Sequence, residues 1–221
     1  MRKLNEVYAT LLKEHSPQGW WPLIKKGKVI HHPSFTTKRL TKSERFEICT
    51  GAILTQNTNW GNVEKALLNL HKEHLLSAEK IANLPHKRLA RLITPSGYFN
   101  QKATKLKIFS RFSLTLKGRT PTREELLSLW GIGKETADSI LLYAFNVPCF
   151  VVDAYTKRIA SRLGLISLQA SYDEIKAFFE DNLPSDSRLY KEYHALLVAH
   201  AKKYYSKKHS TCPLYKRFRF S

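Results

Sequence analysis

Apolar residues recur every three or four positions along most of the chain. Leu4, Val7, Tyr8, Leu11 and Leu12 follow this spacing between residues 4 and 14, which is the pattern of an amphipathic helix. The same spacing predicts further helices over residues 46–70 (in two parts, broken around 56–61), 75–84, 86–93, 101–114, 122–129, 134–145, 154–163, 171–183 and 189–205. The sequence therefore predicts an all-α protein.

The segment 20–42 breaks this pattern. It contains Pro22 and Pro33 and is rich in lysine, histidine and threonine, so we expect an ordered loop with a short strand. No internal repeat or low-complexity linker divides the chain, and any lobes should be tightly joined.

Charge narrows the class of partner. The 221 residues include 37 lysines and arginines against 18 aspartates and glutamates, which gives a net charge of +19. Such a surface attracts polyanions, so we expect nucleic acid as partner, although a generic RNA-binding protein would fit the charge equally well.

No apolar run reaches the roughly 20 residues of a membrane span, and the N-terminus lacks the apolar stretch of a secretory signal. We expect a cytoplasmic monomer that does not bind membranes.

The segment 122–165 carries the most specific signals. Thr122 and Glu125 have the spacing of a capping box, which marks a helix start. The turn W-G-I-G at 130–133 follows, and then a second helix. Both glycines can take positive φ and let backbone N–H groups approach a phosphate, while Ile132 points back to hold the helices together. An ordinary tight turn would contain the same glycines.

The apolar run 147–152, which has a strand-like composition, ends at Asp153. A carboxylate here, directly before the helix predicted from residue 154, is a natural N-cap. Capping and catalysis are compatible at this position.

The patterns L-x-G-I-G-x-x-T-A-D-x-I-L and V-P-x-x-V-V-D-x-Y-x-x-R together resemble the endonuclease III superfamily of helix-hairpin-helix DNA glycosylases. The resemblance implies a two-lobed fold with the DNA-binding groove between the lobes. A central helical lobe would cover 36–148, with the hairpin at about 122–145, and a second lobe would join 1–35 to 149–221. Asp153 would be the catalytic carboxylate. The implied contacts of the hairpin with DNA are Gly131, Ile132, Gly133, Lys134 and Thr136.

Two further segments extend the resemblance. I-L-T-Q-N-T at 53–58 is similar to the family segment in which a glutamine enters the space left by the extruded nucleotide. Gln56 and Asn57 are therefore candidate DNA contacts, with a polar turn as the alternative. G-Y-F-N-Q-K-A at 97–103 is similar to a family helix entry in which Lys102 would face a phosphate, with a solvated lysine as the alternative.

The resemblance also bears on the chemistry. Family members that cut the strand use a lysine two positions after the second hairpin glycine as an amine nucleophile. Glu135 occupies that position here and cannot form an imine, and Lys134 lies about 100° away around the helix. The sequence therefore predicts a monofunctional glycosylase that uses water, without efficient lyase activity.

Three cysteines, Cys49, Cys149 and Cys212, are widely spaced, so we expect buried free thiols rather than a disulfide framework or a paired-cysteine zinc site. The superfamily has a loop with four cysteines that bind an iron–sulfur cluster. When this pattern is aligned with the C-terminus at Cys212, the other three ligand positions are occupied by Tyr205, Tyr215 and Ser221. We expect no iron–sulfur cluster, no metal and no other cofactor.

The most specific prediction concerns the pocket that would bind the damaged base. W-W-P at 20–22 resembles the 3-methyladenine DNA glycosylase III branch of the superfamily, and Lys207 or Lys208 falls near a pocket lysine of that branch. An alkylated purine is cationic, stacks well on an indole face and leaves as a neutral base. Trp20, Trp21 and Pro22 are therefore candidate pocket residues, with anchoring of a loop on the core as the alternative.

The expected function is excision of alkylated bases such as 3-methyladenine from double-stranded DNA. A monofunctional glycosylase for mismatched thymine, uracil or adenine is the alternative within enzymes. A non-catalytic helix-hairpin-helix module that only binds DNA is the alternative outside them.

Overall fold

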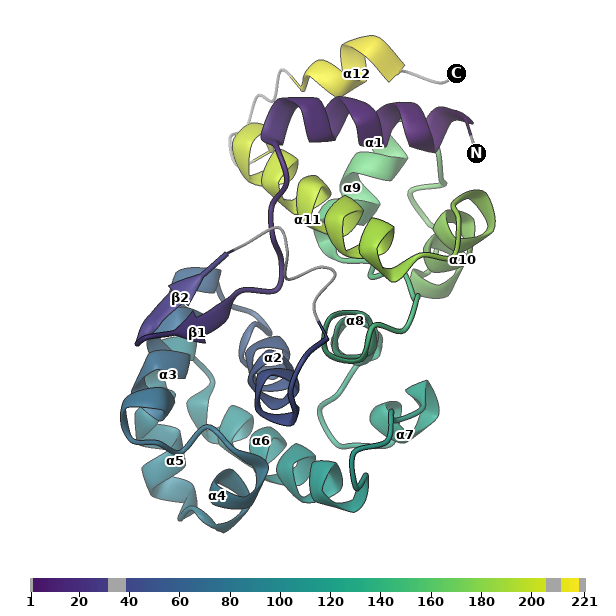
Figure 1. The fold of residues 1–221 in the computed structure, drawn as a ribbon. Helices are drawn as coiled ribbons and strands as arrows, with labels where there is room; N and C mark the ends of the chain where they lie inside the picture. Colours follow the sequence, from purple (N-terminus) through teal and green to yellow (C-terminus); the bar gives the residue numbers. More distant parts are fainter. Residues whose placement is uncertain (1, 32–38, 206–211, 219–221) are drawn as a thin grey trace. The chain divides into compact units, whose positions relative to one another are not determined.

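The computed structural model describes residues 2–31, 39–205 and 212–218 (Figure 1). These residues form twelve α-helices and one two-stranded hairpin. The prediction of a helical protein is confirmed. No helix within the described ranges is long and apolar enough to cross a membrane.

The chain divides into two compact units. The terminal unit comprises Met1–Trp20, His32–Thr37 and Asn146–Ser221, and the central unit comprises Trp21–His31 and Lys38–Phe145. The sequence predicted that residues 21–31 belong to the second lobe, together with 149–221. Residues 21–31 belong to the central unit because the N–H of Ile24 donates to Glu47 Oε1 at 2.6 Å, and Trp21 packs against Gly51.

Seven α-helices form the described part of the central unit. They are α2 (Lys42–Leu54), α3 (Trp60–Lys72), α4 (Ala78–Asn83), α5 (His86–Leu92), α6 (Phe99–Thr115), α7 (Arg123–Leu127) and α8 (Lys134–Ser139). A 3₁₀ turn, η2 (Thr94–Ser96), precedes α6, and a π-helical segment, η3 (Ile140–Ala144), continues α8. Helix α6 packs on α4 and α5, while α2 packs on η3. The capping box of Thr122 and Glu125 is present at the start of α7, as the sequence predicted.

The least helical segment contains an antiparallel hairpin, β1 (Leu23–Lys25) and β2 (Lys28–Ile30), with Leu23 opposite Ile30. Lys26 and Gly27 make its turn with φ values of 51° and 72°. Two consecutive positive φ angles are those of a type I′ turn, which matches the twist of the strands.

The terminal unit contains α1 (Arg2–His15), α9 (Ala154–Arg162), α10 (Tyr172–Asn182), α11 (Ser187–Tyr204) and α12 (Pro213–Phe218). Helix α11 contacts both α1 and α9, and α12 lies beside α1 (Figure 1). Phe150 stacks on Phe179 in the core with ring centroids 4.2 Å apart, and Tyr193 meets both rings edge-on. The strand-like run 147–152 has no regular secondary structure. Its apolar composition reflects burial of Phe150 and Val151 in this core.

Candidate active site

The turn between α7 and α8 is built around one glycine with a positive φ. Gly131 has φ 81°, whereas Gly133 has φ −91° and is the N-cap of α8. The expectation of positive φ therefore applies only to Gly131. Gly133 is exposed, and a Cβ placed there would meet no other atom within 4 Å. Ile132 is buried at 5% exposure and holds the turn inward, as its apolar side chain indicated.

The first turn of α8 separates exposed from buried side chains. Lys134 and Glu135 are exposed, so the lyase-lysine position presents a carboxylate to solvent. Thr136 was expected to contact DNA, but its side chain is buried and its Oγ1 accepts a hydrogen bond of 3.0 Å from Gln56 Nε2. This corrects the role of its hydroxyl, because the group is already used inside the protein.

Gln56 lies just after α2 and connects three elements. Its Nε2 also donates to Gly131 O at 3.0 Å, and its Oε1 accepts from Lys105 Nζ of α6 at 2.6 Å. The neighbouring Asn57 is exposed and has φ 52°. The structure thus places Gln56 beside the hairpin turn, and contact of either residue with DNA stays a prediction.

Lys102 is buried inside the central unit. Its side chain is 1% exposed, and Nζ donates to Leu54 O at 2.7 Å and to Ser96 O at 2.6 Å. Burial and the nearby charge of Lys105 lower the pKa of Lys102 to about 8. Both sequence interpretations, phosphate contact and solvated lysine, are wrong here because the ammonium group satisfies two carbonyl oxygens of the central unit.

Asp153 is the N-cap of α9, which confirms the local prediction. Its Oδ1 accepts hydrogen bonds from Thr156 N at 2.7 Å and Thr156 Oγ1 at 2.9 Å. The other carboxylate oxygen, Oδ2, lies 3.7 Å from His194 Nε2 of α11. Thr156 therefore fixes one oxygen of the carboxylate, His194 lies beside the other, and the side chain retains 14% exposure.

The surroundings of Asp153 favour its ionised form. Burial alone would raise the pKa of the carboxyl, but the interactions with His194 and the hydrogen bonds from Thr156 outweigh it and hold the pKa below its usual value. A partly buried, ionised carboxylate can stabilise positive charge that develops beside it.

The predicted pocket residues have separate surroundings. Trp21 is 8% exposed and packs edge-on with Trp60 and Tyr143, at centroid distances of 5.4 and 5.2 Å. Pro22 is buried, and Trp20, which belongs to the terminal unit, is half-buried. These contacts of Trp21 support the alternative interpretation, in which it anchors its loop on the core. Lys207 and Lys208 lie outside the described residues.

Two residues that the sequence did not single out belong to these sites. His194 is forty-one positions beyond Asp153, and only the packing of α11 on α9 brings them together. Trp130 directly precedes Gly131 and is 57% exposed, with Lys105 Nζ 5.9 Å from its ring centroid. A large aromatic residue adjoining a glycine turn was the available signal for Trp130, whereas His194 had none.

A two-glycine hairpin between helices, together with an aspartate that caps the helix after the next buried segment, defines a helix-hairpin-helix protein of the DNA glycosylase class. Comparison with known proteins agrees. Residues 50–185 match the family model described as HhH-GPD superfamily base excision DNA repair protein. The chain is 46% identical over 222 aligned residues to MJ1434 of Methanocaldococcus jannaschii, a candidate DNA repair glycosylase, covering 95% of this chain and 92% of that one.

Solved structures show the same fold. The 3-methyladenine DNA glycosylase MagIII of H. pylori, bound to 1,N6-ethenoadenine, has a TM-score of 0.70 and 32% identity, covering 91% of this chain and 95% of that one. A non-covalent endonuclease III–DNA complex has a TM-score of 0.76 at 19% identity, with coverages of 99% and 94%. The chain belongs to the HhH-GPD superfamily and is a DNA glycosylase of base excision repair.

Proposed function

We propose that this glycosylase is monofunctional and hydrolyses the N-glycosidic bond of alkylated bases, such as 3-methyladenine, in double-stranded DNA. The similarity to MagIII supports the alkylated-base class. The observation that carries the catalytic part is the ionised carboxylate of Asp153, which accepts two hydrogen bonds from Thr156 and lies 3.7 Å from His194 Nε2.

Bond cleavage leaves positive charge on the deoxyribose. The Asp153 carboxylate would stabilise that charge and orient the attacking water, and its bonds to Thr156 keep it from rotating away. An alkylated purine leaves as a neutral base, so the site needs little acid catalysis. This fits a centre built around a carboxylate with a lowered pKa.

The absence of strand cleavage follows from Glu135. Its exposed carboxylate stands two positions after Gly133 and cannot form a Schiff base with the sugar. We further propose that the chain holds no iron–sulfur cluster. The whole sequence has three cysteines, fewer than the four thiolates that such a cluster requires, and Cys49 and Cys149 lie in different units of the fold.

Duplex DNA would be held mainly through phosphates. The exposed turn at Gly133 and Lys134 offers backbone and side-chain donors in the central unit. In the terminal unit, a groove of about 560 Å³ runs along α9 and is lined in part by Lys157, Arg158 and Arg162. With a net charge of +19, binding should weaken strongly as salt is added. We propose that Trp20, which is half-buried, stacks on the extruded base.

The experiment incubates the protein with duplexes that each carry one lesion, followed by alkali cleavage of abasic sites. We expect release of 3-methyladenine by the wild type and at least a roughly 100-fold lower rate for Asp153→Asn, whose amide oxygen can still cap α9. Thr122→Asn removes no charge and changes another N-cap, so it is the matched control. Activity only on mismatched or oxidised bases would overturn the substrate class. Full activity of Asp153→Asn would favour a different catalytic group, and a borohydride-trapped complex would contradict the role of Glu135.

A further inference from the structure

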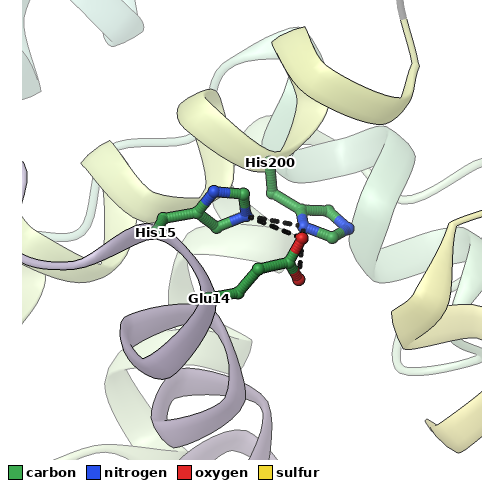
Figure 2. A group of neighbouring side chains, drawn as sticks. All are labelled: Glu14, His15 and His200. Atoms are coloured by element: carbon green, nitrogen blue, oxygen red, sulfur yellow. Dashed lines mark hydrogen bonds and ion pairs between the residues drawn. The ribbon is translucent and has the colours of Figure 1, made fainter.

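Three potential metal ligands meet in the terminal unit, apart from Asp153 and the hairpin. Glu14 and His15 end α1, and His200 lies in α11 (Figure 2). One ligand atom from each of the three lies within 4.8 Å of the others. Figure 2 shows the carboxylate and the two rings pointing toward one another. We propose that these three residues bind a divalent transition-metal ion of the zinc class.

The distances fit such an ion. His15 Nε2 lies 2.9 Å from His200 Nδ1, Glu14 Oε1 lies 3.8 Å from His15 Nε2, and Glu14 Oε2 lies 3.7 Å from His200 Nδ1. In a tetrahedral site with bonds of about 2.0–2.1 Å, two donor atoms are about 3.4 Å apart. The observed distances lie on both sides of that value, and the two Glu14 distances belong to different carboxylate oxygens. Small rotations of the three side chains would bring one oxygen and the two nitrogens to tetrahedral spacing. Water would take the fourth position.

The second ring nitrogen of His200 is also oriented. Its Nε2 lies 3.1 Å from Cys212 Sγ, on the side of the ring opposite the three-residue cluster. A proton on Nε2, shared with this sulfur, leaves the Nδ1 lone pair directed at the cluster. Metal-binding histidines commonly have such an outer partner, which fixes the tautomer. Cys212 would therefore support the site without binding the ion.

The three side chains are shielded from solvent. His200 is fully buried, and Glu14 and His15 are partly buried. Lys203 Nζ and the Tyr204 hydroxyl both bond to Glu14 Oε1, so Oε2 is the carboxylate oxygen best placed to bind. The Lys203 side chain is 53% exposed and can turn into solvent when the ion enters.

The ligand set decides the class of ion. Two imidazole nitrogens and one carboxylate oxygen favour zinc, cobalt or nickel over magnesium or calcium, which prefer oxygen ligands throughout. The ion would tie the end of α1 to α11, the helix that also carries His194. Its role would be to stabilise the terminal unit rather than to take part in bond cleavage.

The test titrates zinc chloride into the EDTA-treated full chain and follows heat release and the thermal unfolding midpoint. We expect one zinc per chain and a raised midpoint. His15→Ala and Glu14→Gln should weaken zinc binding by more than about 100-fold, beyond the loss typical of outer partners. His86→Ala and Glu124→Gln, at exposed positions of the central unit, are the matched controls and should bind as the wild type does.

Two further measurements distinguish loss of the metal site from loss of folding. Far-UV circular dichroism verifies that each variant is folded before titration, and cobalt in place of zinc should give the visible absorption of a tetrahedral site. Cys212→Ala should keep the stoichiometry and lose about 10-fold in affinity. The proposal fails if the wild type takes up no stoichiometric zinc, if His15→Ala binds normally, or if Cys212→Ala alone abolishes binding. None of these outcomes affects the role proposed for Asp153.

Discussion

Gln56 Nε2 donates a 3.0 Å hydrogen bond to the carbonyl oxygen of Gly131, which joins the loop after α2 to the hairpin turn across 75 positions of sequence. Lys105 completes the arrangement because its Nζ bonds Gln56 Oε1 while its stem packs against Gly131. The shape of the turn therefore depends on side chains from two other elements, and the two glycines of the turn should respond differently to substitution.

Gly131→Ala should mainly reduce stability. The residue has φ 81°, and an added Cβ would lie 2.5–2.8 Å from carbon atoms of Lys105. The left-handed conformation alone costs about 1–2 kcal/mol with a side chain. Gly118→Ala is the matched control, because Gly118 has φ 91° and open space around it. A greater loss of urea-unfolding free energy for Gly131→Ala than for Gly118→Ala would measure the contact with Lys105, and equal losses would show that the contact is unimportant.

Gly133→Ala should mainly reduce DNA binding. Its φ of −91° suits alanine, no atom lies within 4 Å of the added methyl group, and loss of a glycine N-cap costs about 1 kcal/mol or less. The methyl group would instead keep a phosphate away from the turn. We expect at least a roughly 10-fold weaker affinity for an abasic-site duplex, measured by fluorescence anisotropy at fixed salt. Unchanged affinity would mean that this turn does not touch the backbone.

His194→Ala should move the acid limb of the pH–rate profile to higher pH. The interaction of His194 with Asp153 Oδ2 helps to hold the pKa of that carboxyl down, so its removal raises the pKa and the carboxylate is protonated at a higher pH than in the wild type. Single-turnover excision rates between pH 4 and 8 would show the shift. His194→Asn, which keeps a polar side chain at this position, should shift the profile less. Identical profiles for all three proteins would remove His194 from the site.

The sequence was sufficient for most of the fold because its helices carry local signals. The Thr122–Glu125 box and the Asp153 cap depend on residues three positions apart, and both are present. Helix α12 was missed, since six residues give too little periodicity to read. The run 147–152 was ambiguous because burial among aromatic rings selects the same apolar residues as a strand does.

The candidate site could be predicted only where its residues are close in sequence. The hairpin and Asp153 fall within one continuous stretch, whereas His194 reaches Asp153 through the packing of α11 on α9. Lys102 was misread because a lysine near a helix start is usually solvated. Nothing in the local sequence indicates that Leu54 O and Ser96 O converge on its ammonium group.

Lys102→Met should destabilise the protein without a specific effect on DNA binding. The change removes two hydrogen bonds from a charged donor and leaves two carbonyl oxygens unsatisfied, at a cost of about 3 kcal/mol or more. Lys87→Met removes the same charge from an exposed position and is the matched control. Urea unfolding should show a lower unfolding free energy for Lys102→Met than for Lys87→Met, while the two variants should have the same DNA affinity per folded molecule. A specific loss of affinity in a stable Lys102→Met protein would restore the phosphate contact.

Glu47→Gln should stabilise the protein above neutral pH. Burial is the main cause that raises the pKa of this carboxyl from 4.5 to about 7, although the N–H of Ile24 bonds its Oε1. Above pH 7 the folded protein therefore carries a desolvated charge. As the pH falls from 7 toward 4.5 the folded state binds a proton that the unfolded state does not, so this cost disappears.

Glutamine keeps the acceptor for Ile24 and never ionises. The gain in unfolding free energy should therefore reach about 3 kcal/mol at pH 8, which is the value of a pKa raised from 4.5 to about 7, and should vanish near pH 4. Urea unfolding of wild type and variant at pH 4, 6 and 8 measures this, with Glu124→Gln at an exposed position of α7 as the control. A gain independent of pH would show that Glu47 is already protonated or solvated across this range. The hairpin β1–β2 would then pack on α2 without an energetic cost from a buried Glu47 carboxylate.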